Sequence, residues 1–219
     1  MLTQARLLTQ IISFNMAMST PGRQGATPLT SRSTPRPGGR SARVQSAIHR
    51  AVRELQAESG RADLTVPAIA ARAGVTPSTI YRRWGDLPQL LSDVAVENLR
   101  PDGEPPDTGS LRGDLQAWAE QYLDEIASRP GRALIRDVLA GPADENPGQC
   151  HGFTCGQVDI LRGRALARGE CAPSTEALMD RLVAPLVYRV LFSSTPPTSD
   201  YLRTLIDGVL GEPGVPAPR

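Results

Sequence analysis

The 219-residue chain has no lysine, few aromatic residues and no long apolar run. All 24 basic residues are arginine, and aromatic residues make up only 4% of the sequence. No segment reaches the roughly 18 consecutive apolar residues that a membrane-spanning helix needs. The sequence therefore excludes a membrane-embedded protein and predicts no membrane partner. The 40% hydrophobic content suffices for one sizeable core or two small ones, which argues against a disordered chain.

Cysteine is also scarce. The three cysteines, Cys150, Cys155 and Cys171, are an odd number without a disulfide framework, which predicts a reducing, cytoplasmic location. Residues 1–15 carry a broken apolar run and no small-residue cleavage site, so they do not predict a signal peptide. Met16 and Met18 follow, and a translation start at either of them is an alternative.

The formal net charge of +1 conceals an uneven distribution of charge along the chain. Residues 1–84 contain 12 arginines and three acidic residues, whereas residues 85–219 contain 12 arginines and 20 acidic residues. This division predicts a polyanionic partner for the first part only, and nucleic acid is the natural candidate. Residues 1–40 are predicted to be a disordered basic arm, because the Ser, Thr, Pro, Gly and Arg residues from position 19 onward cannot build a core.

Three helices are predicted after this arm. Apolar residues at helical spacing place the first at 41–59. Thr65 is a predicted N-cap residue, and Gly74 ends the short second helix that follows it. The pair Thr76-Pro77 starts the third helix, which runs to about Arg83. Two short helices joined by a glycine-containing turn form a helix-turn-helix, whose second helix enters the DNA major groove.

The two faces of this third helix differ in chemistry. At about 100° per residue, Ile80 and Trp84 lie on one side and are predicted to be core residues. The opposite side carries only hydroxyl and guanidinium side chains: Ser78, Thr79, Arg82 and Arg83. These groups reach base edges and phosphates, and arginine can grip guanine bidentately. The alternative is a merely solvated face.

The segment from Thr65 to Trp84 resembles the DNA-binding domain of the TetR family of bacterial transcriptional regulators, and the resemblance extends over about residues 41–95. It implies an all-α fold with two domains. The first is an N-terminal three-helix helix-turn-helix DNA-binding domain at 41–85. The second is a C-terminal helical ligand-binding and dimerisation domain at 86–211, which we expect to be followed by a disordered tail at 212–219.

The resemblance also assigns residue roles. It implies that Tyr81 contacts the DNA backbone, with packing between helices as the alternative. Leu87 stands where the family often has a phosphate-contacting lysine, so that contact is not expected here. Asp86 and Gln89 form a predicted capping box for the next helix. The complete set of predicted DNA contacts is Arg40, Arg43, Thr65, Thr76, Pro77, Ser78, Thr79, Tyr81, Arg82 and Arg83.

Arg40 and Arg43 belong to the arm and its junction with the first helix. Arginine is favoured in the DNA minor groove, which arms ahead of a helix-turn-helix can enter. Plain non-specific attraction to DNA is an equally supported reading of these two residues.

The C-terminal part is predicted to be helical throughout, apart from a break at 101–109 and a loop at 141–152. A long helix begins at Pro173, and Pro185 should kink it by removing a backbone donor. The other predicted helices span 86–99, 110–126, 130–139, 157–168 and 199–210. The resemblance implies that the final two helices pack against their symmetry mates as a four-helix bundle, which gives an isologous homodimer.

These features predict a sequence-specific, homodimeric transcriptional regulator that binds a palindromic operator. The resemblance implies a repressor that a small-molecule effector releases from DNA, which requires the effector to bind the released state better. The candidate pocket residues are Trp118, Tyr122, Phe153 and Tyr188, and ordinary core packing is the alternative for each. No cofactor is predicted.

Two other functions are alternatives. Cys150, His151, Cys155 and Cys171 suggest a thiol- or metal-sensing regulator, although their spacing is not a recurrent zinc pattern. An enzyme is not predicted, because the sequence has neither a phosphate-binding glycine loop nor a recognisable nucleophile and base, and a helix-turn-helix recombinase lacks its catalytic cluster. The other histidine, His49, is expected at the surface or between domains.

Overall fold

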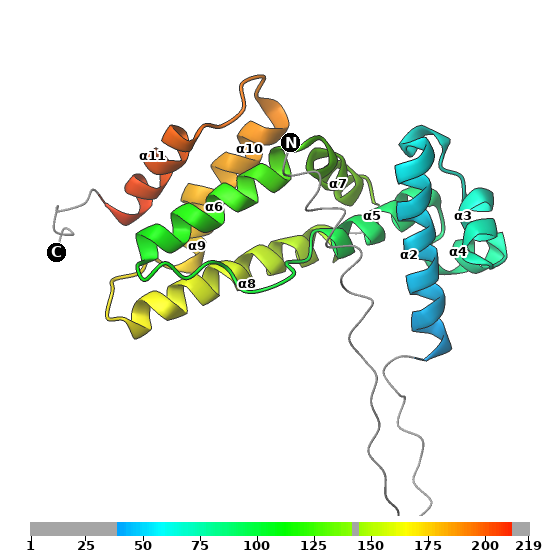
Figure 1. Cartoon of the computed structure of the whole chain (residues 1–219), viewed down its shortest axis with the longest axis horizontal. Coiled ribbons are helices and arrows are strands. Elements are labelled where there is room, and N and C mark those ends of the chain that lie inside the picture. Colours follow the sequence, from blue (N-terminus) through cyan, green and yellow to red (C-terminus); the bar gives the residue numbers. More distant parts are fainter. Residues whose placement is uncertain (1–38, 142–144, 212–219) are drawn as a thin grey trace, which may run out of the picture. The chain divides into compact units, whose positions relative to one another are not determined.

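The computed structural model describes residues 39–141 and 145–211. Within these ranges the chain folds into helices joined by loops, with no strand (Figure 1), which confirms the predicted all-α class. Apart from residues 39 and 40, the predicted N-terminal arm lies outside the described residues, and so does the predicted tail at 212–219.

The N-terminal helices end where local sequence signals predict. They are α2 (Arg40–Ser59), the 3₁₀ turn η1 (Arg61–Asp63), α3 (Val66–Ala73), α4 (Pro77–Trp84) and α5 (Leu87–Asn98). The side chain of Asp86 accepts a 2.9 Å hydrogen bond from the backbone N–H of Gln89 and caps α5. The reciprocal half of the capping box does not form, since the Oε1 atom of Gln89 is buried without a hydrogen bond to any described residue.

Helices α2 to α5 pack around one apolar cluster. Its buried members include Ile48, Val52, Ile69, Ile80, Trp84, Leu90 and Leu91. Ile80 and Trp84 are 0% and 7% exposed, which confirms their predicted core positions. Burial of a large apolar side chain contributes about 1.5–3 kcal/mol, so the cluster holds α4 firmly against its supporting helices.

The C-terminal helices surround a second apolar cluster. They are α6 (Leu111–Ala127), α7 (Arg129–Ala140), α8 (Glu145–Ala167), α9 (Thr175–Leu178), α10 (Ala184–Phe192) and α11 (Ser199–Leu210). Helix α6 packs against α7, α8, α10 and α11. The largest fully buried side chains of this cluster are Leu115, Leu161, Leu178, Leu182, Leu186, Leu202 and Ile206.

The predicted loop at 141–152 is wrong, because α8 begins at Glu145. Pro147 lies in its first turn, where proline is tolerated, and a Cβ at Gly148, Gly152 or Gly156 would meet nothing within 4 Å. Each glycine costs about 1 kcal/mol relative to alanine, and the packing of the helix outweighs this cost. Cys150, His151 and Cys155 therefore lie on a helix and not in a loop.

The long helix predicted from Pro173 is interrupted. It begins at Thr175, capped by Ser174, and passes through a π-helical turn, η2 (Met179–Val183), before α10. Pro185 lies just after this turn and lacks the N–H that a regular helix would use there. A π turn changes the hydrogen-bond register of the helix. The helix is therefore distorted next to Pro185, where the sequence predicts a kink.

Helix α5 contributes to the first apolar cluster and also to a third, small one. Its residues Ala95 and Val96 form a small cluster with Val138 of α7, against which Phe153 of α8 packs. Consequently α5 contacts the helix-turn-helix elements and also α7 and α8. None of the helices described combines the length and the apolar character needed to cross a lipid bilayer.

Candidate DNA-binding surface and effector region

The turn between α3 and α4 follows its sequence signals. The hydroxyl of Thr65 accepts a 3.3 Å hydrogen bond from the N–H of Ala68 and caps α3. Gly74 has φ 68° and ψ 34°, a left-handed conformation that favours glycine, and its N–H closes the end of α3. The chain then enters α4 at Pro77, with Thr76 as the extended residue before it.

The first turn of α4 carries a hydroxyl cluster. The hydroxyl of Thr76 lies 2.9 Å from that of Ser78 and 3.1 Å from that of Thr79. It makes no capping bond to the backbone, and the N–H of Thr79 donates instead to the backbone carbonyl of Thr76 at 2.9 Å. The hydroxyl groups of this turn suit contacts with phosphate and base edges.

Further along α4, Tyr81 and Arg82 are exposed. Tyr81 is 49% exposed, and so it is not confined to packing between helices. Arg82 makes no hydrogen bond or ion pair with any residue in the described part of the chain. Arg40 and Arg43 are exposed at the start of α2. The structure therefore leaves each of these four side chains accessible to DNA.

Arg83 is also exposed, but its guanidinium is held by neighbouring side chains of the protein. Its guanidinium donates a 3.0 Å hydrogen bond to the hydroxyl of Ser41 and a second bond to Oε1 of Gln45. It also lies over the ring of Trp84, 5.2 Å from the centroid. The two adjacent arginines of α4 thus have different surroundings.

Arg83 lies at one end of a continuous series of polar contacts, which we call the polar ladder. Its members on α2 are spaced four residues apart, on one side of the helix: Ser41, Gln45, His49 and Arg53. The members on α4 and α5 are Arg83, Trp84, Asp93 and Glu97. The ladder therefore ties the recognition helix to both α2 and α5.

Asp93 is the central acceptor of the ladder. Its Oδ2 atom lies 3.1 Å from Nε2 of His49 and accepts bonds from the indole N–H of Trp84 at 2.9 Å and from Nε2 of Gln45 at 3.3 Å. The other ring nitrogen of His49, Nδ1, contacts Oε2 of Glu97. Both ring nitrogens thus face carboxylate oxygens, and only the protonated imidazolium can donate to both.

His49 is only 3% exposed, contrary to the surface position that was one of the two expected for it. Burial by itself lowers its pKa, but hydrogen bonds and charge attraction from Asp93 and Glu97 together raise the pKa above the ordinary histidine value. The same contacts lower the pKa of Asp93 and of Glu97. The geometry and the charges therefore both favour the protonated form of His49.

Sequence reasoning missed the ladder. The four-residue spacing from Ser41 to Arg53 was the available signal, but its acceptors Asp93 and Glu97 lie more than forty positions further along the chain. Such a distant pairing cannot be read from one helix alone.

The four predicted pocket residues do not meet in one place. Trp118 and Tyr122 stack with ring centroids 5.3 Å apart in the C-terminal core. Burial, the largest influence, raises the pKa of Tyr122 to about 12, despite a hydrogen bond with Thr154. Phe153 packs in the α5–α7–α8 cluster instead, beneath the guanidinium of Arg100. Tyr188 is 66% exposed and so does not line an interior pocket.

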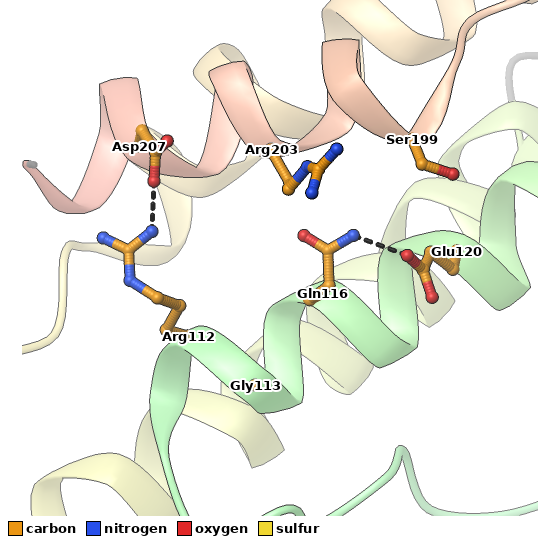
Figure 2. A pocket seen from close by; sticks show the side chains of 7 residues that line it. All are labelled: Arg112, Gly113, Gln116, Glu120, Ser199, Arg203 and Asp207. Atoms are coloured by element: carbon orange, nitrogen blue, oxygen red, sulfur yellow. Dashed lines mark hydrogen bonds and ion pairs between the residues drawn. The ribbon is translucent and has the colours of Figure 1, made fainter. Parts of the chain in front are cut away.

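A groove of about 450 Å³ lies between α6 and α11 (Figure 2). The residues that line it are Arg112, Gly113, Gln116, Glu120, Ser199, Arg203 and Asp207. Arg112 pairs with Asp207 across the groove, and Gln116 donates to Glu120 at 2.6 Å. The groove contains none of the four predicted pocket residues. Its two arginines, Arg112 and Arg203, are already in ion pairs with Asp207 and Asp200.

The cysteine and histidine residues of α8 form one close contact. The Cys155 sulfur lies 3.4 Å from Nε2 of His151. Burial raises the pKa of Cys150, and burial together with Asp159 raises that of Cys155, so both thiols are less ionised than an ordinary cysteine. Within residues 39–141 and 145–211, no three His, Cys, Asp or Glu side chains converge to hold a metal ion.

The α3–turn–α4 unit presents an exposed polar helix on a rigid apolar support, and this defines a helix-turn-helix DNA-binding protein. Sequence comparison then specifies the family. Residues 48–94 match "Bacterial regulatory proteins, tetR family", and residues 105–209 match "Tetracyclin repressor-like, C-terminal domain". The chain belongs to the TetR family and is a DNA-binding transcriptional regulator, a class without enzymatic activity.

Curated relatives agree with this assignment. The uncharacterized HTH-type transcriptional regulator Rv1556 of Mycobacterium tuberculosis is 32% identical over 163 residues, which cover 71% of this chain and 80% of that protein. The HTH-type transcriptional regulator AqdR of Rhodococcus erythropolis is 36% identical over 145 residues, which cover 63% of this chain and 69% of that protein.

Solved structures share the fold. A TetR transcriptional regulator from Rhodococcus sp. RHA1 superimposes with a TM-score of 0.56 at 18% identity, over 79% of this chain and 98% of that one. The TetR family transcription regulator SCO0332 gives a TM-score of 0.54 at 24% identity, over 76% and 96% of the two chains. These likenesses support the arrangement of a helix-turn-helix domain and a C-terminal helical domain.

Proposed function

We propose that this protein represses transcription by binding a palindromic operator as a homodimer, and that a small-molecule effector releases it. The observation that carries the proposal is the exposed hydroxyl and arginine face of α4, held on an apolar core and joined through α5 to a second helical core. Ligand-responsive repression is typical of the TetR family. A regulator of this kind acts where the chromosome is, in the cytoplasm.

The proposed DNA contacts divide into two groups. Ser78, Thr79 and Arg82 face the major groove and read base edges, because their side chains lie opposite the buried face of α4. Backbone contacts position the helix on the duplex. They come from the residues around α3, the start of α4 and the start of α2: Thr65, Thr76, Pro77, Tyr81, Arg40 and Arg43.

The proposed homodimer uses α10 and α11. Tyr188 and Phe192 on α10 are 66% and 74% exposed, and their rings lie 5.2 Å apart. Large aromatic side chains this exposed are unusual on a surface that no partner covers. A second copy of the chain is the occupant we propose, since a two-fold dimer presents two recognition helices to successive major grooves of a palindrome.

The proposed effector binds within the C-terminal helical domain, next to the stacked pair Trp118 and Tyr122. This pair lies beside α8, where Tyr122 meets Thr154. The surroundings combine aromatic rings with a few hydroxyl groups, which suits a mainly apolar molecule with one or two polar groups.

The test begins with a labelled DNA fragment from immediately upstream of the gene that encodes the protein. Specific retention of this fragment in excess unrelated DNA at physiological salt is the expected result. Compounds that release the complex would then identify the effector. Binding of similar strength to any DNA, with a steep salt dependence, would contradict a sequence-specific regulator.

A further inference from the structure

We propose that the polar ladder is a positioning device for DNA reading, in which a protonated His49 holds α4 against α2 and α5 and Arg83 supports α4 instead of contacting a base. This inference rests on the DNA-binding function proposed above. It assigns His49, Gln45, Asp93 and Arg83 a role that is distinct from the role of the exposed face of α4.

The contacts of Asp93 carry the first step. A single carboxylate oxygen accepts from an α2 amide and from the indole of Trp84, and it also faces the imidazole of His49. Trp84 is the last residue of α4. The place where α4 ends is therefore fixed by a hydrogen bond to α5 as well as by apolar packing, and His49 supplies the positive charge that holds this carboxylate in place.

The two adjacent arginines provide the second step. Arg83 is held at three points: by Ser41, by Gln45 and by the ring of Trp84. A base contact in the major groove would require it to abandon these partners. Arg82, one position earlier, has no such partners in the described part of the chain, and so it is free to read a base.

The third step concerns the charges around His49. From α5 it faces Asp93 and Glu97, and from α4 it faces the uncharged ring of Trp84 at a centroid distance of 5.8 Å. Arg53 of its own helix contacts Glu97 at 3.5 Å, and Arg83 of α4 acts on Asp93. The pKa of His49 is raised, and so this residue loses its proton at a higher pH than an ordinary histidine does.

Loss of this proton leaves one of the two carboxylates facing an imidazole nitrogen that no longer donates. The contact with Asp93 or Glu97 then weakens, and the position of α4 becomes less well defined. DNA affinity should therefore fall as the pH rises through the His49 pKa. Guanidinium groups stay charged over the whole range and do not contribute to this change.

The experiment first selects the preferred duplex of the full-length wild-type protein from a randomised duplex pool. Dissociation constants for that duplex, and for versions with single base-pair changes, are then measured at fixed salt from about pH 6 to about pH 9. We expect wild-type affinity to fall about tenfold across this range, which corresponds to a loss of about 1.4 kcal/mol of binding free energy. The His49→Gln variant cannot titrate at this position and should show a flat profile.

Two arginine variants distinguish a residue that supports α4 from a residue that recognises a base pair. Arg83→Ala should weaken binding to every duplex by the same factor, about 5- to 30-fold. Arg82→Ala should instead reduce discrimination at one base pair, while its pH profile matches that of the wild type. If Arg83→Ala loses discrimination at a single base pair, Arg83 reads DNA and the assignment of a supporting role is overturned.

A third set of variants tests the ladder even if His49→Gln does not fold. Gln45→Ala removes one partner of Arg83 and one of Asp93 near the exposed end of the ladder. The double variant Gln45→Ala/Arg83→Ala should weaken DNA binding by less than the sum of the two single effects, because both changes break the contact between Gln45 and Arg83. Additive losses would overturn the ladder as one unit, and so would equal pH profiles for wild type and a folded His49→Gln protein. A pool that yields no preferred duplex would instead refute the proposed function itself.

Discussion

The side-chain amide of Asn146 donates a 2.8 Å hydrogen bond to the hydroxyl of Ser92, which donates in turn to the backbone carbonyl of Val138 at 3.1 Å. Ser92 and Asn146 are both buried. These two bonds link α5, α7 and α8 at the junction between the recognition helices and the C-terminal core. Gly141 packs so closely here that a Cβ would lie 2.6 Å from the Ser92 hydroxyl.

Replacing Ser92 with alanine should destabilise the protein, because the amide of Asn146 and the carbonyl of Val138 lose their partner while staying buried. We expect the free energy of unfolding to fall by about 1–3 kcal/mol, measured by urea denaturation. Ser194→Ala is the control, since Ser194 is exposed. An equal, small effect of both substitutions would show that the buried network adds nothing.

The Arg61–Asp137 ion pair makes a second connection at this junction. It joins η1 of the helix-turn-helix part to α7, and Asp137 is buried. Burial raises the pKa of Asp137, although the charge of Arg61 opposes this rise. The Arg61–Asp137 ion pair and the Ser92 network are thus two polar connections between the C-terminal helices and the DNA-binding helices, in addition to apolar packing.

A second prediction concerns the face of α4. Arg82→Ala should weaken binding to the preferred duplex by about 1–3 kcal/mol if Arg82 contacts a base bidentately. The reason is the loss of paired donors that no neighbouring side chain can replace. Fluorescence anisotropy at fixed salt measures the change, and Arg129→Ala on α7 is the matched control, because Arg129 is an exposed arginine outside the helix-turn-helix. Unchanged affinity for Arg82→Ala would remove it from the proposed reading face.

Local signals predicted much of the helix-turn-helix part, for identifiable physical reasons. The inward position of Ile80 and Trp84 follows from helical periodicity, and the ends of α3 follow from the capping of Thr65 and the left-handed Gly74. The prediction placed a loop over the first half of α8, because its glycines and proline are typical of loops and the packing that stabilises this helix cannot be read from the sequence. The polar ladder and the separate positions of the four predicted pocket residues could not be predicted from the sequence, because both depend on which helices pack together.

A third prediction concerns the proposed dimer. Phe192→Glu should shift the protein from dimer to monomer, because a charge would be buried without a partner at the α10 interface. Sedimentation velocity at micromolar protein measures the change. Leu139→Glu on α7 is the control, because Leu139 is a similarly exposed apolar residue, at 60%, outside α10 and α11. A Phe192→Glu protein that stays dimeric would place the interface elsewhere.

The last prediction uses Asp114, a carboxylate that is fully buried in α6. It accepts bonds from the Thr108 N–H at 2.5 Å and the Thr108 hydroxyl at 2.7 Å, and it pairs at 2.9 Å with Arg168, the residue that follows α8. Burial, the largest influence, raises the pKa of Asp114, but these contacts together lower it below the ordinary aspartate value. The ionised carboxylate therefore holds the segment before α6 against α8.

A folded-state pKa below the unfolded value means that the carboxylate stabilises the fold above about pH 4, and that this contribution disappears as the pH falls through the folded-state pKa. Asp114→Asn should lower the free energy of unfolding near pH 7 by about 1–3 kcal/mol. The difference from wild type should narrow below about pH 4, where the carboxylate of the unfolded wild-type chain becomes protonated while that of the folded protein does not yet. Urea titrations at several pH values measure both effects, with exposed Asp124→Asn on the same helix as the control. A stability difference that stays constant with pH would show that the charge of Asp114 is not what stabilises this contact.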